Sequence, residues 1–271
     1  MYFSLIIPVF NRPLEVDELL ASLLLQSYTN FEVIIVEDGS TIKCDQIIAK
    51  YQPKLKIKYY YKLNSGPGLS RNYGANKSKN EYYIFCDSDC IFPPEYFYEV
   101  QKKLKIFYTD AFGGPDKAHD LFSPLQKAIN YAMTSFLTTG GIRGGKRSIN
   151  KFQPRSFNMG ISRKAFQDTG GFGNIHPGED PDLTIRLWEM GYKTQLITDA
   201  YVFHKRRISW IQYYKQVNKF GKCRPILNYR YPHTSRITYW FPTFFILFLI
   251  ISIGFSFVAK NLIPLYLYIF Y

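Results

Sequence analysis

The chain has 271 residues, 46% of them hydrophobic, which suits one full domain with an appendage and excludes global disorder. Its formal net charge is +13, and the last acidic residue is Asp199. Between Lys205 and Arg236 the charged residues are all basic, and an apolar segment follows directly. A basic run beside such a segment argues against nucleic-acid binding and favours a membrane surface.

Short apolar strands alternate with helical patterns in the first third of the chain, which predicts an α/β fold. We expect a mostly parallel sheet with helices on both faces, and ligands beyond the carboxyl ends of its strands. Asn11, Asp38 and Asp87 follow predicted strand ends and could therefore share one crevice. The expected strands are 3–9, 31–36, 57–61 and 82–86, and the expected helices are 14–25, 46–51 and 69–78.

The rest of the chain is less regular. A segment from Thr138 to Lys151 holds four glycines and four basic residues, which predicts a mobile loop that could close over a ligand. The aromatic, basic segment from Trp210 to Phe220 predicts a helix at a membrane surface. We further expect helices over 94–108 and 182–190, and strands over 156–162, 194–197 and 201–203.

The segment from Tyr239 to Val258 carries no charge, and its roughly twenty residues at about 1.5 Å each match a bilayer core. The basic flank predicts residues 1–238 in the cytoplasm; a buried core helix is the alternative. The apolar stretch from Leu262 is either an interfacial tail or the start of a second span. We expect no signal peptide, and reduced thiols at the four cysteines.

Three domains are therefore expected: a catalytic domain over 1–204, a membrane-surface segment over 205–238, and a transmembrane segment with an apolar tail over 239–271.

The acidic triplet Asp87-Ser88-Asp89 follows a predicted strand. Two carboxylates at i and i+2 can converge on one hard cation, Mg²⁺ or Mn²⁺, which would stabilise a diphosphate leaving group. An ordinary solvated turn is the alternative. Asp38 could accept a hydrogen bond from a nucleoside or could cap a turn, and Arg71 could face the same crevice or lie on the surface.

The sequence Glu179-Asp180-Pro181 opens a predicted helix. Because proline suits the first helical position, Asp180 is expected to be the N-cap residue. Its carboxylate could instead, or in addition, take a proton from an acceptor hydroxyl. His204 follows a predicted strand and could bind a metal or phosphate, or lie among surface charges.

Taken together, these motifs resemble family 2 glycosyltransferases of the GT-A fold. The resemblance runs over about residues 3–204 and is carried by five motifs in order, namely 7–11, 37–40, 70–72, 86–89 and 178–180.

The resemblance implies an inverting, metal-dependent transfer from a nucleotide-diphosphate sugar to a hydroxyl acceptor. The expected membrane segment suggests that this acceptor is a saccharide or lipid-linked saccharide delivered at the membrane. The resemblance also implies Asp180 as the base with Glu179 beside it, and Asp89 and His204 as metal ligands. The residues it assigns to the nucleotide sugar are Pro8, Phe10, Asn11, Asp38, Arg71, Asp87 and Ser88.

The chain departs from the family pattern in places. Glu37 stands where many members carry an aspartate, and Cys90 where a further aspartate is common. The Gln-x-x-Arg-Trp signature of processive synthases is missing, which favours addition of a single sugar. The residues also leave open a sugar nucleotidyltransferase and a non-catalytic membrane scaffold. The first lacks its glycine- and lysine-rich N-terminal loop, and the second need not retain Asp38, Asp87, Asp89 and Asp180 together.

Overall fold

The computed structural model describes residues 1–134, 151–205, 209–235 and 237–270. The loop expected between Thr138 and Lys151 lies almost wholly outside these residues. Two compact units are present, Met1–Phe220 and Gly221–Tyr271, and each is described by itself. The expected boundaries at 204 and 238 stay a prediction.

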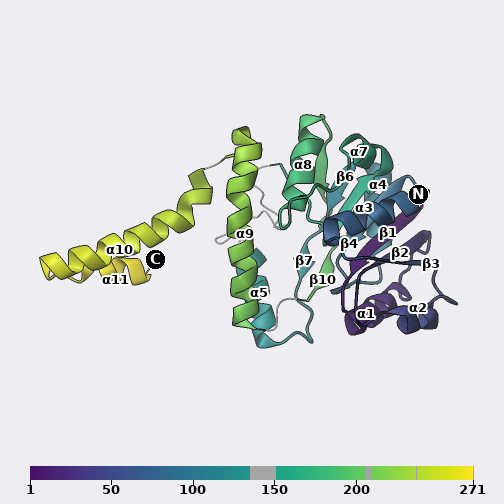
Figure 1. Ribbon diagram of the computed structural model, residues 1–271, viewed down its shortest axis with the longest axis horizontal. Helices are drawn as coiled ribbons and strands as arrows, with labels where there is room; N and C mark the ends of the chain where they lie inside the picture. The colour runs from purple at the N-terminus through teal and green to yellow at the C-terminus, as the bar shows by residue number, and fades with distance from the viewer. Residues whose placement is uncertain (135–150, 206–208, 236, 271) are drawn as a thin grey trace. The chain divides into compact units, whose positions relative to one another are not determined.

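The N-terminal unit is built on a seven-stranded sheet in the order β3-β2-β1-β4-β8-β6-β9 (Figure 1). β8 runs antiparallel to both its neighbours, and the other strands run parallel to one another. The expected mixed, mostly parallel sheet is therefore confirmed. The strands are β1 (Phe3–Val9), β2 (Phe31–Asp38), β3 (Ile57–Lys62), β4 (Tyr82–Cys86), β6 (Ala111–Gly113), β8 (Asn158–Ser162) and β9 (Thr194–Leu196).

Each face of the sheet carries its own apolar cluster, because β2 and β4 are buried along their whole length and β1 everywhere but at Pro8. Successive side chains of β1 alternate between the clusters: Leu5 and Ile7 join one, and Ile6 joins the other. The first face is covered by α1 (Pro13–Leu23), α2 (Asp45–Tyr51) and α4 (Tyr96–Ile106). The second is covered by α3 (Pro67–Lys77), α7 (Arg163–Asp168) and α8 (Glu179–Glu189) (Figure 1).

A small three-stranded sheet, in the order β5-β10-β7, was not expected from the sequence. It joins β5 (Cys90–Ile91), β7 (Asp116–Lys117) and β10 (Val202–His204). β10 pairs antiparallel with β5, so that His204 lies opposite Cys90, and parallel with β7, so that Val202 lies opposite Asp116. The pairing brings His204, at the end of β10, next to the acidic triplet after β4.

The start of α8 differs from the sequence prediction. The helix begins at Glu179, and Gly178 occupies the N-cap position with φ 125°. The prediction that Asp180 caps this helix is therefore wrong. Pro181 is accommodated in the first turn because backbone N–H groups there have no intrahelical partner. Asp180, freed from the cap, carries its carboxylate inside the first turn.

The chain continues into α9 (Trp210–Arg230), which extends beyond the expected end at Phe220. Two short 3₁₀ turns, Pro232–Thr234 and Ile237–Trp240, lead into α10 (Phe241–Ala259) and α11 (Ile263–Phe270). α10 is the one helix in the described residues that is long and apolar enough to cross a membrane. The Tyr268 ring lies 4.5 Å from that of Phe245, so α11 folds back onto α10.

Candidate active site

The site lies beyond the carboxyl ends of β1, β2 and β4, as the topology requires. Asn11 leaves β1 with φ 53°, a left-handed conformation that asparagine tolerates better than most residues. Its side-chain oxygen accepts hydrogen bonds from the backbone N–H groups of Thr41 and Ile42 at 2.9 and 3.0 Å. Asn11 thereby ties the end of β1 to the loop that follows β2.

Asp38 is the buried last residue of β2. Its carboxylate accepts hydrogen bonds from the backbone N–H groups of Ser65 and Gly66 at 2.9 and 2.8 Å, and it pairs with Lys62. Gly66 precedes α3 with φ 90°, a conformation that glycine adopts without strain. Asp38 therefore anchors the loop that starts the Arg71 helix. Its expected contact with the nucleoside stays a prediction.

Glu37, one residue earlier, points into the protein instead. Its Oε2 accepts hydrogen bonds from the Cys44 backbone N–H at 2.9 Å and from the Tyr59 hydroxyl at 2.5 Å. Burial and the neighbouring Glu37 carboxylate raise the pKa of the Cys44 thiol to about 12. This thiol is therefore neutral and unreactive, as expected for the reduced cysteines. All four cysteines are free and buried.

Arg71 connects the two acidic motifs of the site. Its side chain is buried; Nη2 lies 2.5 Å from Asp87 Oδ1, and Nη1 lies 3.5 Å from Glu179 Oε1. The guanidinium carbon also lies 5.4 Å from the centre of the Phe172 ring. The surface alternative for Arg71 is therefore wrong. Its expected contact with the nucleoside stays a prediction, since its observed partners are carboxylates.

The second acidic group, Asp89, meets His204 through the small sheet. His204 Nε2 lies 3.2 Å from Asp89 Oδ1 and 4.0 Å from Asp87 Oδ2. The other oxygens of these aspartates face arginines, since Arg12 Nη1 lies 2.9 Å from Asp89 Oδ2. The Lys205 backbone N–H also donates to the Asp89 carbonyl at 3.0 Å. Two oxygens and one imidazole nitrogen thus face one another.

This donor set fits a divalent cation such as Mn²⁺ or Mg²⁺, because both prefer oxygen ligands and Mn²⁺ also accepts imidazole. Cys90 Sγ lies within 4.8 Å of ligand atoms of Asp89 and His204. It is nevertheless a poor ligand, since it donates to the Phe157 carbonyl at 3.7 Å and burial raises its thiol pKa. Asp87, Asp89 and His204 are the better candidates.

Glu179 and Asp180 differ in their electrostatics although they are neighbours. Burial alone would raise the pKa of Glu179, but the hydrogen bond with His176 and the charge of Arg71 lower it below its ordinary value. His176 Nδ1 lies 3.2 Å from both Glu179 carboxylate oxygens. For Asp180, burial and the Glu179 charge raise the pKa, against Arg71, Arg155 and a hydrogen bond from Ser156.

Asp180 Oδ1 is buried and has no hydrogen-bond partner within the described part of the chain. A carboxylate with one unpartnered oxygen and a raised pKa is suited to accept a proton. The contacts thus link Asp89, His204, Asp87, Arg71 and the Glu179–Asp180 pair into one cluster. Pro8 lies on β1, Phe10 directly follows β1, and Ser88 stands between the two aspartates of the acidic triplet. Their contacts with a nucleotide sugar stay a prediction.

Sequence reasoning missed four charged or titratable residues of the site: Arg12, Asp116, Arg155 and His176. Arg12 follows the Asn11 motif directly, and His176 lies three residues before Glu179, so proximity to a motif was the available signal. Asp116 and Arg155 lie in irregular stretches without such a signal.

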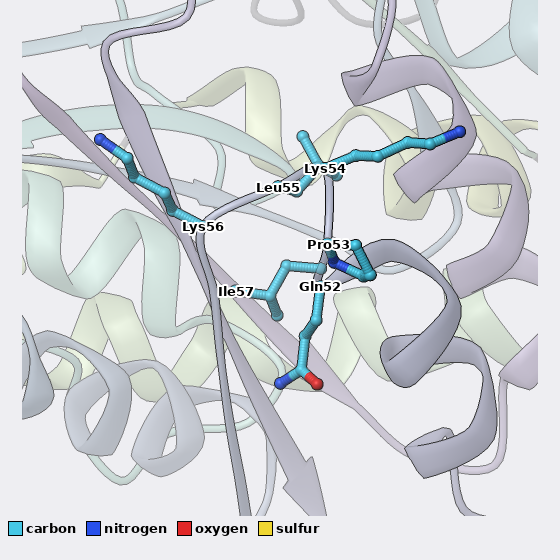
Figure 2. A pocket seen from close by; sticks show the side chains of 6 residues that line it. All are labelled: Gln52, Pro53, Lys54, Leu55, Lys56 and Ile57. Carbon is cyan, nitrogen blue, oxygen red and sulfur yellow. The ribbon is translucent and has the colours of Figure 1, made fainter.

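An open hollow elsewhere on the surface is lined by residues 52–57, between the end of α2 and the start of β3 (Figure 2). Because β3 begins there, the hollow lies at the amino ends of the parallel strands, away from the acidic cluster. Lys54 and Lys56 extend in different directions rather than converging on one point (Figure 2). The hollow therefore adds nothing to the site.

The mixed, mostly parallel sheet, the acidic groups at its carboxyl edge and the helix carrying Glu179 and Asp180 are typical of transferases that use nucleotide sugars. The model of the family described as "Glycosyl transferase family 2" matches residues 4–170, and that of "Glycosyl transferase family group 2" matches residues 157–271. The chain belongs to glycosyl transferase family 2.

Two curated relatives are similar to part of this chain. The chain is 37% identical over 109 residues to an uncharacterised glycosyltransferase of Rickettsia conorii, covering 40% of this chain and 18% of that protein. It is 42% identical over 93 residues to the poly(ribitol-phosphate) beta-N-acetylglucosaminyltransferase TarS of Staphylococcus aureus, covering 33% of this chain and 16% of that protein. The chain thus matches less than a fifth of each relative's length.

Two solved structures share the fold. A crystal structure of S. aureus TarS residues 1–349 with UDP-GlcNAc is 25% identical, with TM-score 0.60, over 77% of this chain and 60% of that one. The mannosyltransferase PcManGT of Pyrobaculum calidifontis, in complex with GDP-Man and Mn²⁺, is 15% identical, with TM-score 0.67, over 86% of this chain and 65% of that one. The expected GT-A architecture is confirmed.

Proposed function

We propose that this chain transfers a sugar from a nucleotide-diphosphate donor to a hydroxyl acceptor with inversion at the anomeric carbon. The observation that carries the proposal is the cluster in which Arg71 connects Asp87, at the candidate cation site, to Glu179, beside the candidate base. Donor activation and proton removal can therefore occur at neighbouring positions. The family and the TarS structure with UDP-GlcNAc support a nucleotide-sugar donor.

Asp87, Asp89 and His204 would hold the divalent cation, which supplies charge neutralisation for the diphosphate leaving group. The Mn²⁺ named with PcManGT supports this choice by fold only. Asp180 Oδ1 accepts the proton of the acceptor hydroxyl, and the hydroxyl oxygen forms a bond to the anomeric carbon. The bond from that carbon to the diphosphate breaks on the opposite face, so a nucleoside diphosphate leaves. Arg71 and His176 keep Glu179 ionised beside the base.

Membrane attachment is the second part of the proposal. Only 11% of an eighteen-residue apolar window of α10 is buried inside the protein, and large apolar side chains such as Phe248 and Ile251 are exposed on the helix. This argues against the core-helix alternative. The basic segment before it would lie against anionic lipid, at about 1 kcal/mol for each lysine or arginine near the surface. The positive flank would keep the catalytic side in the cytoplasm.

A membrane-attached transferase of this kind would act on a saccharide or lipid-linked saccharide in the synthesis of cell-surface polysaccharide or glycolipid. Its acceptor would be delivered at the membrane, which the described aromatic residues of α9, such as Trp210 and Tyr214, would contact. A chain shortened to residues 1–238 keeps only the salt-sensitive surface contacts and should leave the membrane fraction in high salt, whereas retention in the pellet in high salt would refute the anchor.

A donor screen tests the transferase proposal directly. The detergent-solubilised full chain is heated with UDP-, GDP- and dTDP-sugars and Mn²⁺, starting with UDP-GlcNAc. A donor at a hundred times its Kd should add about 2.7 kcal/mol to the free energy of unfolding. Release of the nucleoside diphosphate is then followed with acceptor, in Mn²⁺ and in excess EDTA.

Equal turnover in EDTA and Mn²⁺ would refute the cation site but leave the transferase intact. Release of pyrophosphate from a nucleoside triphosphate would favour the nucleotidyltransferase instead. Donor binding without transfer to any acceptor would favour the non-catalytic scaffold.

A further inference from the structure

Asp116 is a buried acidic residue outside the predicted motifs. It lies on β7, and its side chain is fully buried. β7 pairs with β10, the strand that ends at His204, and Asp116 Oδ2 lies 4.0 Å from His204 Nδ1. We propose that Asp116 is a positioning residue that orients the His204 imidazole for the divalent cation. This inference rests on the cation site of the proposed function.

The imidazole is constrained on its edge and on its face. One ring nitrogen, Nδ1, faces Asp116, while the other, Nε2, lies 3.2 Å from Asp89 Oδ1. The Phe157 ring stacks on the imidazole, with centroids 4.9 Å apart and planes inclined by 25°. The stacking fixes the plane of the ring. The carboxylates of Asp116 and Asp89 favour the orientation in which Nδ1 faces Asp116 and Nε2 faces Asp89.

The choice of tautomer gives this arrangement its chemical consequence. A neutral imidazole carries one proton, and only the nitrogen without it can coordinate a metal. The negative charge of Asp116 beside Nδ1 favours the proton there, although 4.0 Å is too long for a direct hydrogen bond. The lone pair of Nε2 is then left facing Asp87 and Asp89. A carboxylate behind a metal-binding histidine acts in this way in many metal sites.

The small sheet explains how two distant chain segments reach this geometry. β10 is the central strand, with Cys90 of β5 opposite His204 on one side and Asp116 of β7 opposite Val202 on the other. Asp116 therefore approaches His204 from β7, on one side of β10, and the acidic triplet approaches it from β5, on the other side. Lys117, the next residue on β7, is exposed and places its ammonium 3.4 Å from the centre of the Tyr201 ring.

The test measures Mn²⁺ affinity without turnover. Free Mn²⁺ is titrated by electron paramagnetic resonance against the full chain in detergent, for wild type, Asp116→Asn, His204→Ala and the double variant. We expect Asp116→Asn to weaken Mn²⁺ binding about 10–100-fold, the usual effect of losing such a partner. In the His204→Ala background the same change should have no further effect. Lys117→Ala, on the same strand, is the matched control and should bind Mn²⁺ like the wild type.

Two results would overturn the inference while leaving the transferase proposal standing. One is wild-type Mn²⁺ affinity in Asp116→Asn, and the other is an equal loss with and without His204, which would mean that Asp116 acts through the fold. If the wild type binds no Mn²⁺, both the inference and the cation site fail. Should Asp116→Asn not fold, Asp116→Glu replaces it; the retained carboxylate should bind Mn²⁺ more tightly than Asp116→Gln.

Discussion

The proposed donor-side rim, formed by Asn11 and Asp38, differs from the proposed acceptor-side pair, Glu179 and Asp180, in how its polar atoms are used. Both oxygens of the Asp38 carboxylate accept backbone hydrogen bonds, and the Asn11 side-chain oxygen accepts two. Asp180, by contrast, keeps one buried oxygen without a partner in the described chain. Polar groups whose hydrogen bonds are all made stabilise the local structure. A buried polar group without a partner lowers stability, and such groups occur where the chemistry of a site requires them.

The largest effect that tests this contrast is on turnover. Asp180→Asn should lower kcat by about 10²–10⁴-fold, because a general base contributes about that much, with donor affinity nearly unchanged. Its melting temperature should not fall, since the change removes a buried charge. Steady-state kinetics and donor titration measure both.

Asp182→Asn is the matched control on the same helical turn. Asp182 pairs with Arg186 at 2.7 Å, so its loss should cost stability and spare kcat. Full activity in Asp180→Asn would remove Asp180 from the role of base.

On the proposed donor side, a substitution at Asp38 should lower the free energy of unfolding. Asp38→Ala leaves two backbone N–H groups and Lys62 without their acceptor, and should lower the free energy of unfolding by about 3 kcal/mol. Urea denaturation measures this loss. Asp45→Ala, an exposed acidic residue in the first turn of α2, should cost less than about 1 kcal/mol. Equal losses would contradict the anchoring role of Asp38.

Two substitutions at Asn11 distinguish the contribution of its backbone conformation to stability from that of its side-chain hydrogen bonds, with a smaller expected effect. Asn11→Ala loses the hydrogen bonds to the loop and places alanine at φ 53°, for a total of about 2 kcal/mol. Asn11→Gly loses the same hydrogen bonds without the backbone strain, so it should be the more stable of the two variants by chemical denaturation. A glycine variant less stable than the alanine variant would contradict this account.

The smallest effect is a displacement of the pH profile. Asp180 must be ionised to act, so kcat should fall as the pH drops through its raised pKa. Glu179→Gln removes the neighbouring negative charge, which lowers the pKa of Asp180, so the acidic limb should move to lower pH. Arg71, Arg155 and Ser156 also face Asp180 and are unchanged in this variant. An acidic limb that stays in place or moves upward would contradict the coupling.

The sequence predicted the bounds of an element correctly where one hydrophobic pattern ran along the whole element. β1 and β4 have the predicted bounds because mainly apolar runs such as Phe3–Val9 are buried on both faces. The start of α8 was misplaced because Asp180-Pro181 matches a common capping pattern, while the positive φ of Gly178 is visible only in the structure. The helix predicted from Trp210 ended too early, at Phe220, because the glycine and proline within α9 resemble helix stop signals.

The candidate site was predictable only in part, for a related reason. Asp87, Asp89 and His204 could be proposed one by one from strand ends, and the structure brings them together. The sheet that does so has strands of two or three residues, too short for any periodicity to show. Asp116 therefore had no signal at all, because its relation to His204 exists only through the pairing of β7 with β10.

The position of β10 has a consequence for how the protein is made. A nascent chain acquires both aspartates of the acidic triplet early, but the imidazole opposite Cys90 arrives only when His204 leaves the ribosome. Fragments that stop before this residue carry the sheet and the carboxylates without the completed cluster. Synthesis itself thereby delays assembly of the cluster until α8, which carries Glu179 and Asp180, has already been translated.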